Sequence, residues 1–318
     1  MRALASARRW LVGNRWAWSF IGALVVWGLT VASVGGRGAG ATLSVALAFS
    51  AFYAIVGIGE MLVISTGGGN IDLSIPSVMM LAGYLSMGAM HDQNSLLPLG
   101  ILVALGVGLG AGVANVILIR VTKIPPMVAT LASGFVMQSM TIAYSTTSTA
   151  TPAPMLLHFS LSRVFGIPTL AIPVVLFAVL MGLLLSRSVF GRSVLAIGQN
   201  ERAAYLANVS IQGTLATVYI ISAVLAAVAG LLLAGYSGGA SLDMSQGFLL
   251  MAIAVVVLGG TSIAGGRASV AGVWGASMFL YLIVTMLNVF GVGAGVQYVV
   301  TGIIIITVLT LSEGKEAT

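Results

Sequence analysis

Three carboxylic acids stand out among the few groups in this chain that could do chemistry: Glu60, Asp72 and Asp243. Glu60 lies four residues before the end of an apolar segment, and an acidic side chain costs about 3 kcal/mol at the centre of a membrane helix. Three interpretations of Glu60 stay open. Its carboxyl group lies near the lipid headgroups in contact with water, pairs with a basic group of this or a partner chain, or lines a translocation path.

Asp72 and Asp243 lie in two similar sequences, GGGNIDLSIPSVMM over 67–80 and GGASLDMSQGFLLM over 238–251, at a constant offset of 171. A glycine pair ends a helix readily because glycine adopts the left-handed conformation. Asp or Ser can then cap the next helix, and contact with a substrate is the alternative role. Because broken helices at membrane depth face protein or a water-filled cavity, both sequences are predicted hinges. The residues assigned to the hinges or the translocation path are Glu60, Gly67, Gly68, Asn70, Asp72, Ser74, Asp243 and Ser245.

The elements that must position these residues are membrane helices. Hydrophobic residues make up 59% of the 318 residues and charged residues 6%, whereas a soluble domain carries about 25% charged residues. A helix needs about 20 apolar residues to span the hydrocarbon core. We therefore predict an all-α integral membrane protein with about ten transmembrane helices, at 16–34, 43–64, 75–91, 96–119, 126–145, 168–186, 212–236, 247–259, 268–290 and 296–312.

Basic residues predict the orientation, since Lys and Arg concentrate in short cytoplasmic loops. With the N-terminus in the cytoplasm, ten alternating spans place 11 basic residues on the cytoplasmic side and two on the other. Both termini are then cytoplasmic, and the two similar sequences lie on opposite sides of the membrane. We expect one transmembrane domain over 1–318, built as an inverted five-plus-five repeat with halves at about 43–145 and about 212–312, a plan typical of transport proteins. The charges are spread over several loops and form no nucleic-acid-binding patch.

The longest cytoplasmic connection covers residues 187–211 and contains a predicted short helix. Asn200 is a suitable N-cap, and Glu201 suits the first turn. Ala203 and Leu206 then share one apolar helix face. Such a face needs a partner protein, and a helix lying on the lipid headgroups is the alternative. The residues assigned to coupling with a partner are Arg192, Asn200, Glu201, Ala203 and Leu206.

Several motifs of catalysis are absent from the sequence. A P-loop needs Gly-Lys followed by Ser or Thr, but Lys123 precedes Ile and Lys315 precedes Glu. There is no Cys, and His91 and His158 are isolated, which argues against thiolate chemistry, a multi-histidine metal site and a Ser-His-Asp triad. We therefore expect a chain that is not an enzyme and holds no cofactor or metal, with any ATP hydrolysis in a partner subunit.

Several segments together resemble the bacterial monosaccharide ABC-transporter permeases of the ribose, xylose and autoinducer-2 class. They are GEMLVISTGGGNIDLSIPSVMMLAG, KIPPMVATLA, SRSVFGRSVLAIGQNERAAYLANVS and the later VVVLGGTSIAGGRASVAGVWGA. The resemblance covers residues 43 to 312 and is poor at naming the sugar, since branched-chain amino-acid permeases share part of the pattern. The chain departs from the family pattern where Gly69-Asn70 intervenes before Ile-Asp-Leu-Ser, and where Ile75-Pro76 replaces the usual Val-Gly.

The resemblance implies the permease subunit of a binding-protein-dependent importer in the bacterial inner membrane. It implies that two permease chains, identical or different, form the pore, and that cytoplasmic ABC ATPase subunits bind the 187–211 connection. A periplasmic binding protein would deliver a sugar or sugar-like solute. A branched-chain amino-acid permease is the alternative within this class. Outside it, the alternatives are an ion-driven secondary transporter with Glu60 as ion site and an intramembrane enzyme.

Overall fold

The structure is a computed structural model that describes residues 16–36, 38–146 and 151–313, and most of these residues are helical. The first part contains α2 (Ala17–Ser33), α3 (Ala39–Ser65), α4 (Ile75–Met90), the 3-10 helix η1 (Asn94–Leu96), α5 (Leu97–Arg120) and α6 (Pro126–Ser145). α7 (Pro154–Leu161) and the antiparallel strands β1 (Arg163–Val164) and β2 (Ile167–Pro168) follow. The last part contains α8 (Ala171–Arg187), α9 (Val189–Gln199), α10 (Glu201–Leu206), α11 (Ile211–Tyr236), α12 (Phe248–Leu258), α13 (Val270–Val289) and α14 (Ala294–Glu313).

Each of the ten predicted apolar segments forms a helix within a few residues of its predicted bounds. Among the described residues, however, five helices are long and apolar enough to cross a membrane: α3, α5 with η1, α6, α11 and α13. α8 and α9 add a sixth if this pair, bent by 68°, counts as one broken span. The predicted total of ten spans is therefore not confirmed, because α2, α4 and α12 have 17, 16 and 11 residues.

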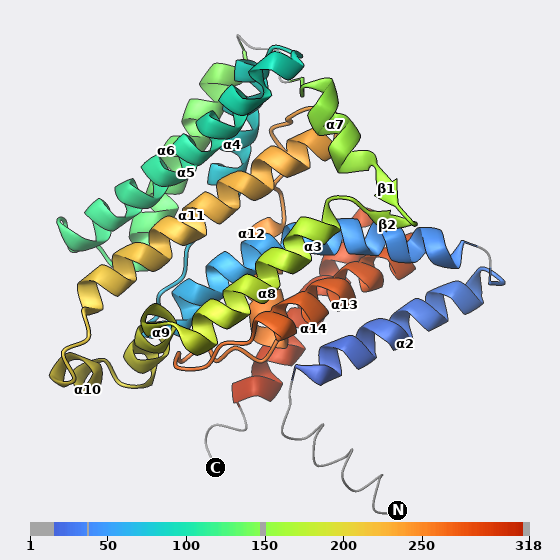
Figure 1. Ribbon diagram of the computed structural model, residues 1–318. Helices are drawn as coiled ribbons and strands as arrows, with labels where there is room; N and C mark the ends of the chain where they lie inside the picture. The colour runs from blue at the N-terminus through green and yellow to red at the C-terminus, as the bar shows by residue number, and fades with distance from the viewer. Residues whose placement is uncertain (1–15, 37, 147–150, 314–318) are drawn as a thin grey trace, which may run out of the picture.

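The helices run between two ends of the bundle (Figure 1). One end carries α9 and α10 and is called the α10 end; the other carries α7 and the β1–β2 hairpin and is called the α7 end. α11 starts beside α10 and ends beside α7, where Gly235 packs against Leu156. α3 runs the other way, from β2 to α9. The two long central helices are therefore antiparallel.

Glycine allows α11 to pack closely against its neighbours, as small residues do in membrane proteins. Gly112 of α5 faces α11, and a Cβ there would lie 2.6 Å from Cα of Ile220. Gly230 of α11 lies against the backbone of Met79 in α4, where a side chain also has no room. These contacts hold α4 and α5 directly against α11 and so fix the surroundings of the first helix break.

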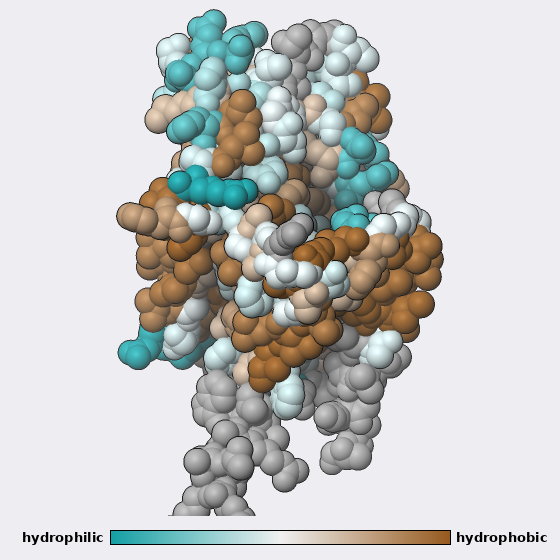
Figure 2. Space-filling view, turned by 90° about the vertical axis from the view of Figure 1, so that its right-hand side faces the viewer, coloured by the Kyte–Doolittle hydropathy of each residue, from teal (hydrophilic) through white to brown (hydrophobic). Residues whose placement is uncertain are grey.

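Charged and apolar residues are distributed unevenly over the surface. Six of the seven basic residues in the described part of the chain lie at the α10 end, namely Arg120, Lys123, Arg187, Arg192, Arg202 and Arg267, and Arg163 lies in the hairpin. In the face shown in Figure 2, hydrophobic residues cover broad areas and hydrophilic residues gather in patches toward its upper part. Large side chains such as Leu102, Phe135 and Leu176 are exposed on α5, α6 and α8. Lipid can cover such a helical surface without leaving backbone groups unsatisfied.

Candidate functional site

The first helix break, residues 66–74, lies at the α10 end and buries the side chain of Asp72 completely. Asp72 Oδ1 accepts hydrogen bonds from the backbone N–H and the hydroxyl of Ser74, at 3.1 and 2.5 Å. Its Oδ2 accepts from the hydroxyl of Ser222 in α11 at 2.8 Å. Asp72 therefore shapes the entry to α4 and joins the break to a distant helix. Ser74 is the N-cap residue of α4 but makes no side-chain cap, and its hydroxyl oxygen instead accepts from Asn115 while the hydroxyl donates to Asp72.

Other polar side chains extend this network to α5 and α6. Asn115 Nδ2 in α5 donates to the Ser74 hydroxyl at 2.9 Å, and Ser133 in α6 donates to the side-chain carbonyl of Asn115. The Leu73 N–H donates to the Thr130 hydroxyl at 3.1 Å. We call the following six residues the break cluster, each of them 0–6% exposed: Glu60, Asp72, Ser74, Asn115, Ser133 and Ser222.

Glu60 faces the same break from α3. Its two carboxyl oxygens accept from the backbone N–H of Asp72, at 3.2 and 3.3 Å. The interpretation of Glu60 as a partly hydrated group near the headgroups is wrong, because its exposed fraction is 0%. Within the described residues no basic side chain pairs with it, so an ion pair to this part of the chain is not found. A place in a translocation path and a pair with a partner chain stay predictions.

The second break, residues 237–247, lies at the α7 end in different surroundings. The side chain of Asp243 is exposed and makes no hydrogen bond in the described structure, whereas Ser245 is buried. α12 begins only after Gly247, which has a φ of 83° and offers no side-chain cap. The predicted capping of α12 by Asp243 or Ser245 is therefore wrong, because the turn at Gly247 separates both residues from the helix.

The glycines of the first break connect it to α9. Gly67 and Gly68 have φ values of 70° and 64°, in the left-handed region that suits glycine. Gly67 packs against Gly198 of α9, and a Cβ at Gly67 would lie 2.8 Å from the carbonyl oxygen of Ala264. Asn70 follows them as a half-buried residue whose Oδ1 accepts from the Tyr219 hydroxyl at 3.3 Å. Backbone contact therefore links this break to α9 without any intervening side chain.

The 187–211 connection forms two short helices, α9 and α10, where the sequence predicts one. Asn200 caps α10 as predicted, since its Oδ1 accepts from the N–H of Ala203 at 2.9 Å. Glu201, Ala203 and Leu206 are exposed, Leu206 to 76%. Arg192 lies on α9 and donates to the carbonyl of Arg187, so it stands apart from the α10 face.

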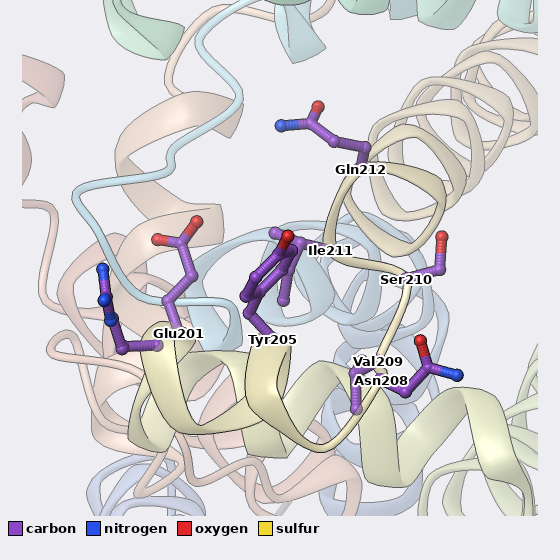
Figure 3. A pocket seen from close by; sticks show the side chains of 8 residues that line it. Glu201, Tyr205, Asn208, Val209, Ser210, Ile211 and Gln212 are labelled. Atoms are coloured by element: carbon purple, nitrogen blue, oxygen red, sulfur yellow. The ribbon is translucent and has the colours of Figure 1, made fainter.

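An open hollow lies beside α10 (Figure 3). The side chains of Glu201 and Tyr205 rise from α10 toward Gln212 at the start of α11, and Asn208 lies along the connection between the two helices. Tyr205 is 70% exposed beside Leu206. The surface of α10 is therefore accessible and combines apolar with polar groups, as a protein-binding surface does.

The chemistry of the break cluster is hydrogen bonding. Its donors and acceptors satisfy each other across α3, α4, α5, α6 and α11, which suits a structural junction. No group of three or more His, Cys, Asp or Glu among the described residues could hold a metal ion. Sequence reasoning assigns Glu60, Asp72 and Ser74 to this place and favours an interhelical hydrogen bond for Asn115, which is confirmed, but it misses Ser222, Ser133 and Thr130.

Comparison with known proteins places the chain in a family. A family model described as the permease component of branched-chain amino acid transport systems matches residues 42–309. This chain belongs to that permease family. The match covers both helix breaks and the 187–211 connection, so the break cluster and α10 lie within the family domain.

Curated relatives of this permease are import permeases named for sugars or a signalling molecule. The ribose import permease of Bacillus subtilis is 32% identical over 83% of this chain and 82% of its own length. The fructose import permease of Rhizobium meliloti is 30% identical over 86% and 78% of the two chains. An autoinducer 2 import permease of Photorhabdus laumondii is 30% identical over 79% and 77%. The comparison with solved structures gives no match.

Proposed function

We propose that this permease is the membrane subunit of an ATP-driven importer for a sugar or sugar-like solute. Family membership supports transport, and the names of its relatives favour a sugar over a branched-chain amino acid. These relatives are permeases and this chain has no P-loop lysine of its own, and both observations support ATP hydrolysis in a partner ATPase. A solute-binding protein would deliver the solute at the α7 end.

The exposed face of α10 is the observation that carries this proposal. Leu206 and Tyr205 offer apolar area next to polar groups on a short helix that lies outside the bundle. α10 leads directly into α11, and Ser222 of α11 donates a hydrogen bond to Asp72 in the first break. A partner ATPase that moves α10 would therefore move α11, and α9 would transmit the same motion to the break through Gly198.

Helix bounds favour two related halves of opposite orientation. Adding 171 to the bounds of α3 gives 210–236, and α11 covers 211–236. The same shift takes α5 to 268–291, and α13 covers 270–289. The two breaks lie at opposite ends of the bundle. Such a plan supports alternating access by two hinged halves, with a second permease chain, identical or different, completing the pore.

The concentration of basic residues at the α10 end supports a cytoplasmic position for that end. With this orientation we infer cytoplasmic termini, and the bacterial import permeases among the relatives support the bacterial inner membrane as the host membrane. The break residues Gly67, Gly68 and Asn70 then face the cytoplasmic side, and Asp243 and Ser245 face the periplasmic side.

The substitution Leu206→Asp tests the coupling role. We expect it to abolish co-purification of the ATPase and uptake of sugar into vesicles, because a charge would replace exposed apolar contact area. Phe165→Asp, at a fully exposed position of the hairpin, is the control and leaves ATPase capture intact. Unchanged capture and uptake in Leu206→Asp would remove the coupling role.

A second candidate is an ion-driven transporter, which the complete burial of the acidic Glu60 favours. The two candidates differ in their energy source. Uptake that survives ATP depletion and collapses with an uncoupler would support the ion-driven candidate, and the reverse result supports the ATP-driven importer.

A further inference from the structure

A cavity of about 310 Å³ lies between the C-terminal end of α5 and the first turns of α11. Two cations, Arg120 and Lys123, line it on the α5 side. Gln212 and Tyr219 of α11 and Asn70 of the first break supply further polar groups. The remaining lining is apolar and consists of Val116, Ile119, Leu215 and Ala216. The cavity thus offers positive charge and hydrogen-bond donors at the end of the bundle where basic residues concentrate.

Neither cation has an acidic partner among the described residues. Arg120 Nε donates to Oε1 of Gln212 at 2.7 Å, a bond that joins α5 to α11 across the cavity. The Nη groups of Arg120 and the amino group of Lys123 make no hydrogen bond within the described part of the chain. Two neighbouring cations repel each other, and an anion between them removes that repulsion. Their charges are therefore available to a ligand.

The inner wall of the cavity is ordered by hydrogen bonds. Tyr219 is buried, and its hydroxyl donates to Oδ1 of Asn70. Asn70 Nδ2 in turn donates to the Thr66 hydroxyl at 2.9 Å. Ser210, the N-cap residue of α11, makes no side-chain cap, so the first backbone N–H groups of this helix add positive potential beside Gln212. A ligand in the cavity would touch α5, α11 and the first break together.

We propose that this cavity binds a phosphate-bearing group, either the headgroup of an acidic phospholipid or a free phosphomonoester. The guanidinium of Arg120 offers planar donors that match phosphate oxygens, and Lys123 adds a point charge. The volume lies at the small end for ligand cavities and suits a headgroup. Basic pockets between membrane helices bind acidic headgroups on the cytoplasmic side. The cytoplasmic position of this cavity rests on the proposed function, whereas its cations and its lining do not.

Binding to the purified full-length chain in neutral detergent tests the proposal. The probes are short-chain phosphatidylglycerol, the matched short-chain phosphatidylcholine and glycerol phosphate, each titrated by thermal shift and by isothermal calorimetry. We expect phosphatidylglycerol or glycerol phosphate to bind and phosphatidylcholine to fail. The pair R120Q/K123Q should weaken binding by about tenfold or more, since charge-assisted hydrogen bonds are lost. The matched pair R187Q/R192Q removes the same charge outside the cavity and should bind as the parent does.

A second variant keeps both charges and fills the space. Ala216→Phe places a ring in the cavity lining and should also abolish binding. Tighter binding of phosphatidylglycerol than of glycerol phosphate would identify a lipid headgroup as the ligand, and equal binding would identify a soluble phosphomonoester; both results support the site. Absence of binding by either anion overturns it. An equal loss in R187Q/R192Q, or full binding in folded Ala216→Phe, overturns it as well.

Discussion

Replacing Ser222 by Ala removes a hydrogen bond that joins α11 to the first break. The Ser222 hydroxyl is buried and donates to Oδ2 of Asp72 at 2.8 Å. In the described structure this oxygen has no other donor, and Asp72 is shielded from water. A buried acceptor left without a partner costs about 1–3 kcal/mol, and single hydrogen bonds between membrane helices reach about 1.7 kcal/mol. We expect Ser222→Ala to lower the free energy of unfolding by about 1–2 kcal/mol.

Ser277 in α13 provides the matched control. It is buried like Ser222, but its hydroxyl donates to the carbonyl of Val273 in the same helix at 2.8 Å. Such a bond back to the own helix adds little stability, and the carbonyl keeps its backbone partner when the hydroxyl is lost. Ser277→Ala should therefore change the free energy of unfolding by less than about 0.5 kcal/mol. Both variants lose the same oxygen from a helix interior, so the difference isolates the bond to Asp72.

Unfolding by sodium dodecyl sulfate in mixed micelles, followed by tryptophan fluorescence, measures these free energies. The double variant Asp72→Ala/Ser222→Ala completes a thermodynamic cycle, and we expect its loss to fall short of the summed single losses by about 1 kcal/mol. Equal stability of the Ser222→Ala and Ser277→Ala proteins would refute the idea that the break cluster holds the first break to α11. Simple additivity in the cycle would refute it too.

Two further substitutions address the neighbours of the break cluster. Gly198→Ala should stop uptake in a reconstituted transport assay, because its Cβ would collide with backbone atoms of Ser65 and Gly266. Gly182→Ala is the control, since a Cβ there meets free space. Normal uptake by Gly198→Ala would contradict the backbone link between α9 and the first break. In the dodecyl sulfate unfolding assay, Tyr219→Phe should change the free energy of unfolding by less than about 1 kcal/mol, since the half-buried Asn70 can bond to water instead. A loss as large as that of Ser222→Ala would contradict the idea that water replaces the Tyr219 hydroxyl.

The helices could be predicted from the sequence because a segment in lipid has to satisfy its own backbone groups. α6 matches its predicted bounds of 126–145, where Pro126 fixes the first turn. The division of the 187–211 connection into two helices could not be foreseen from apolar periodicity. Asn200 adopts an extended conformation there, with φ −163° and ψ 102°, and so ends α9 while its side chain caps α10.

The acidic members of the break cluster were predictable, but most of their partners were not. Serine inside an apolar helix usually bonds to its own backbone, as Ser277 does, and nothing in the local sequence separates Ser222 from that case. The offset of 171 between the two similar sequences does show a difference between the surroundings of Asp72 and Asp243. It pairs Ser222 with Ala51 and Glu60 with Leu231, so these two polar neighbours of Asp72 have apolar counterparts around Asp243, whereas Ser74 keeps a polar counterpart, Ser245. An unpartnered carboxylate cannot be buried cheaply, which explains why Asp243 remains exposed.

The same asymmetry bears on how the two proposed halves move. Motion confined to the first break must separate Asp72 from Ser222 or Asn115 from Ser74, and each loss leaves a buried polar group unsatisfied. We therefore expect the first break to move as one body with α5, α6 and α11. No comparable bond restrains Asp243 in the described structure, so the second break bends at lower cost. In the proposed importer, a stiff junction beside α9 and α10 would transmit force from a partner at that end, and a softer hinge at the α7 end would absorb the change in shape.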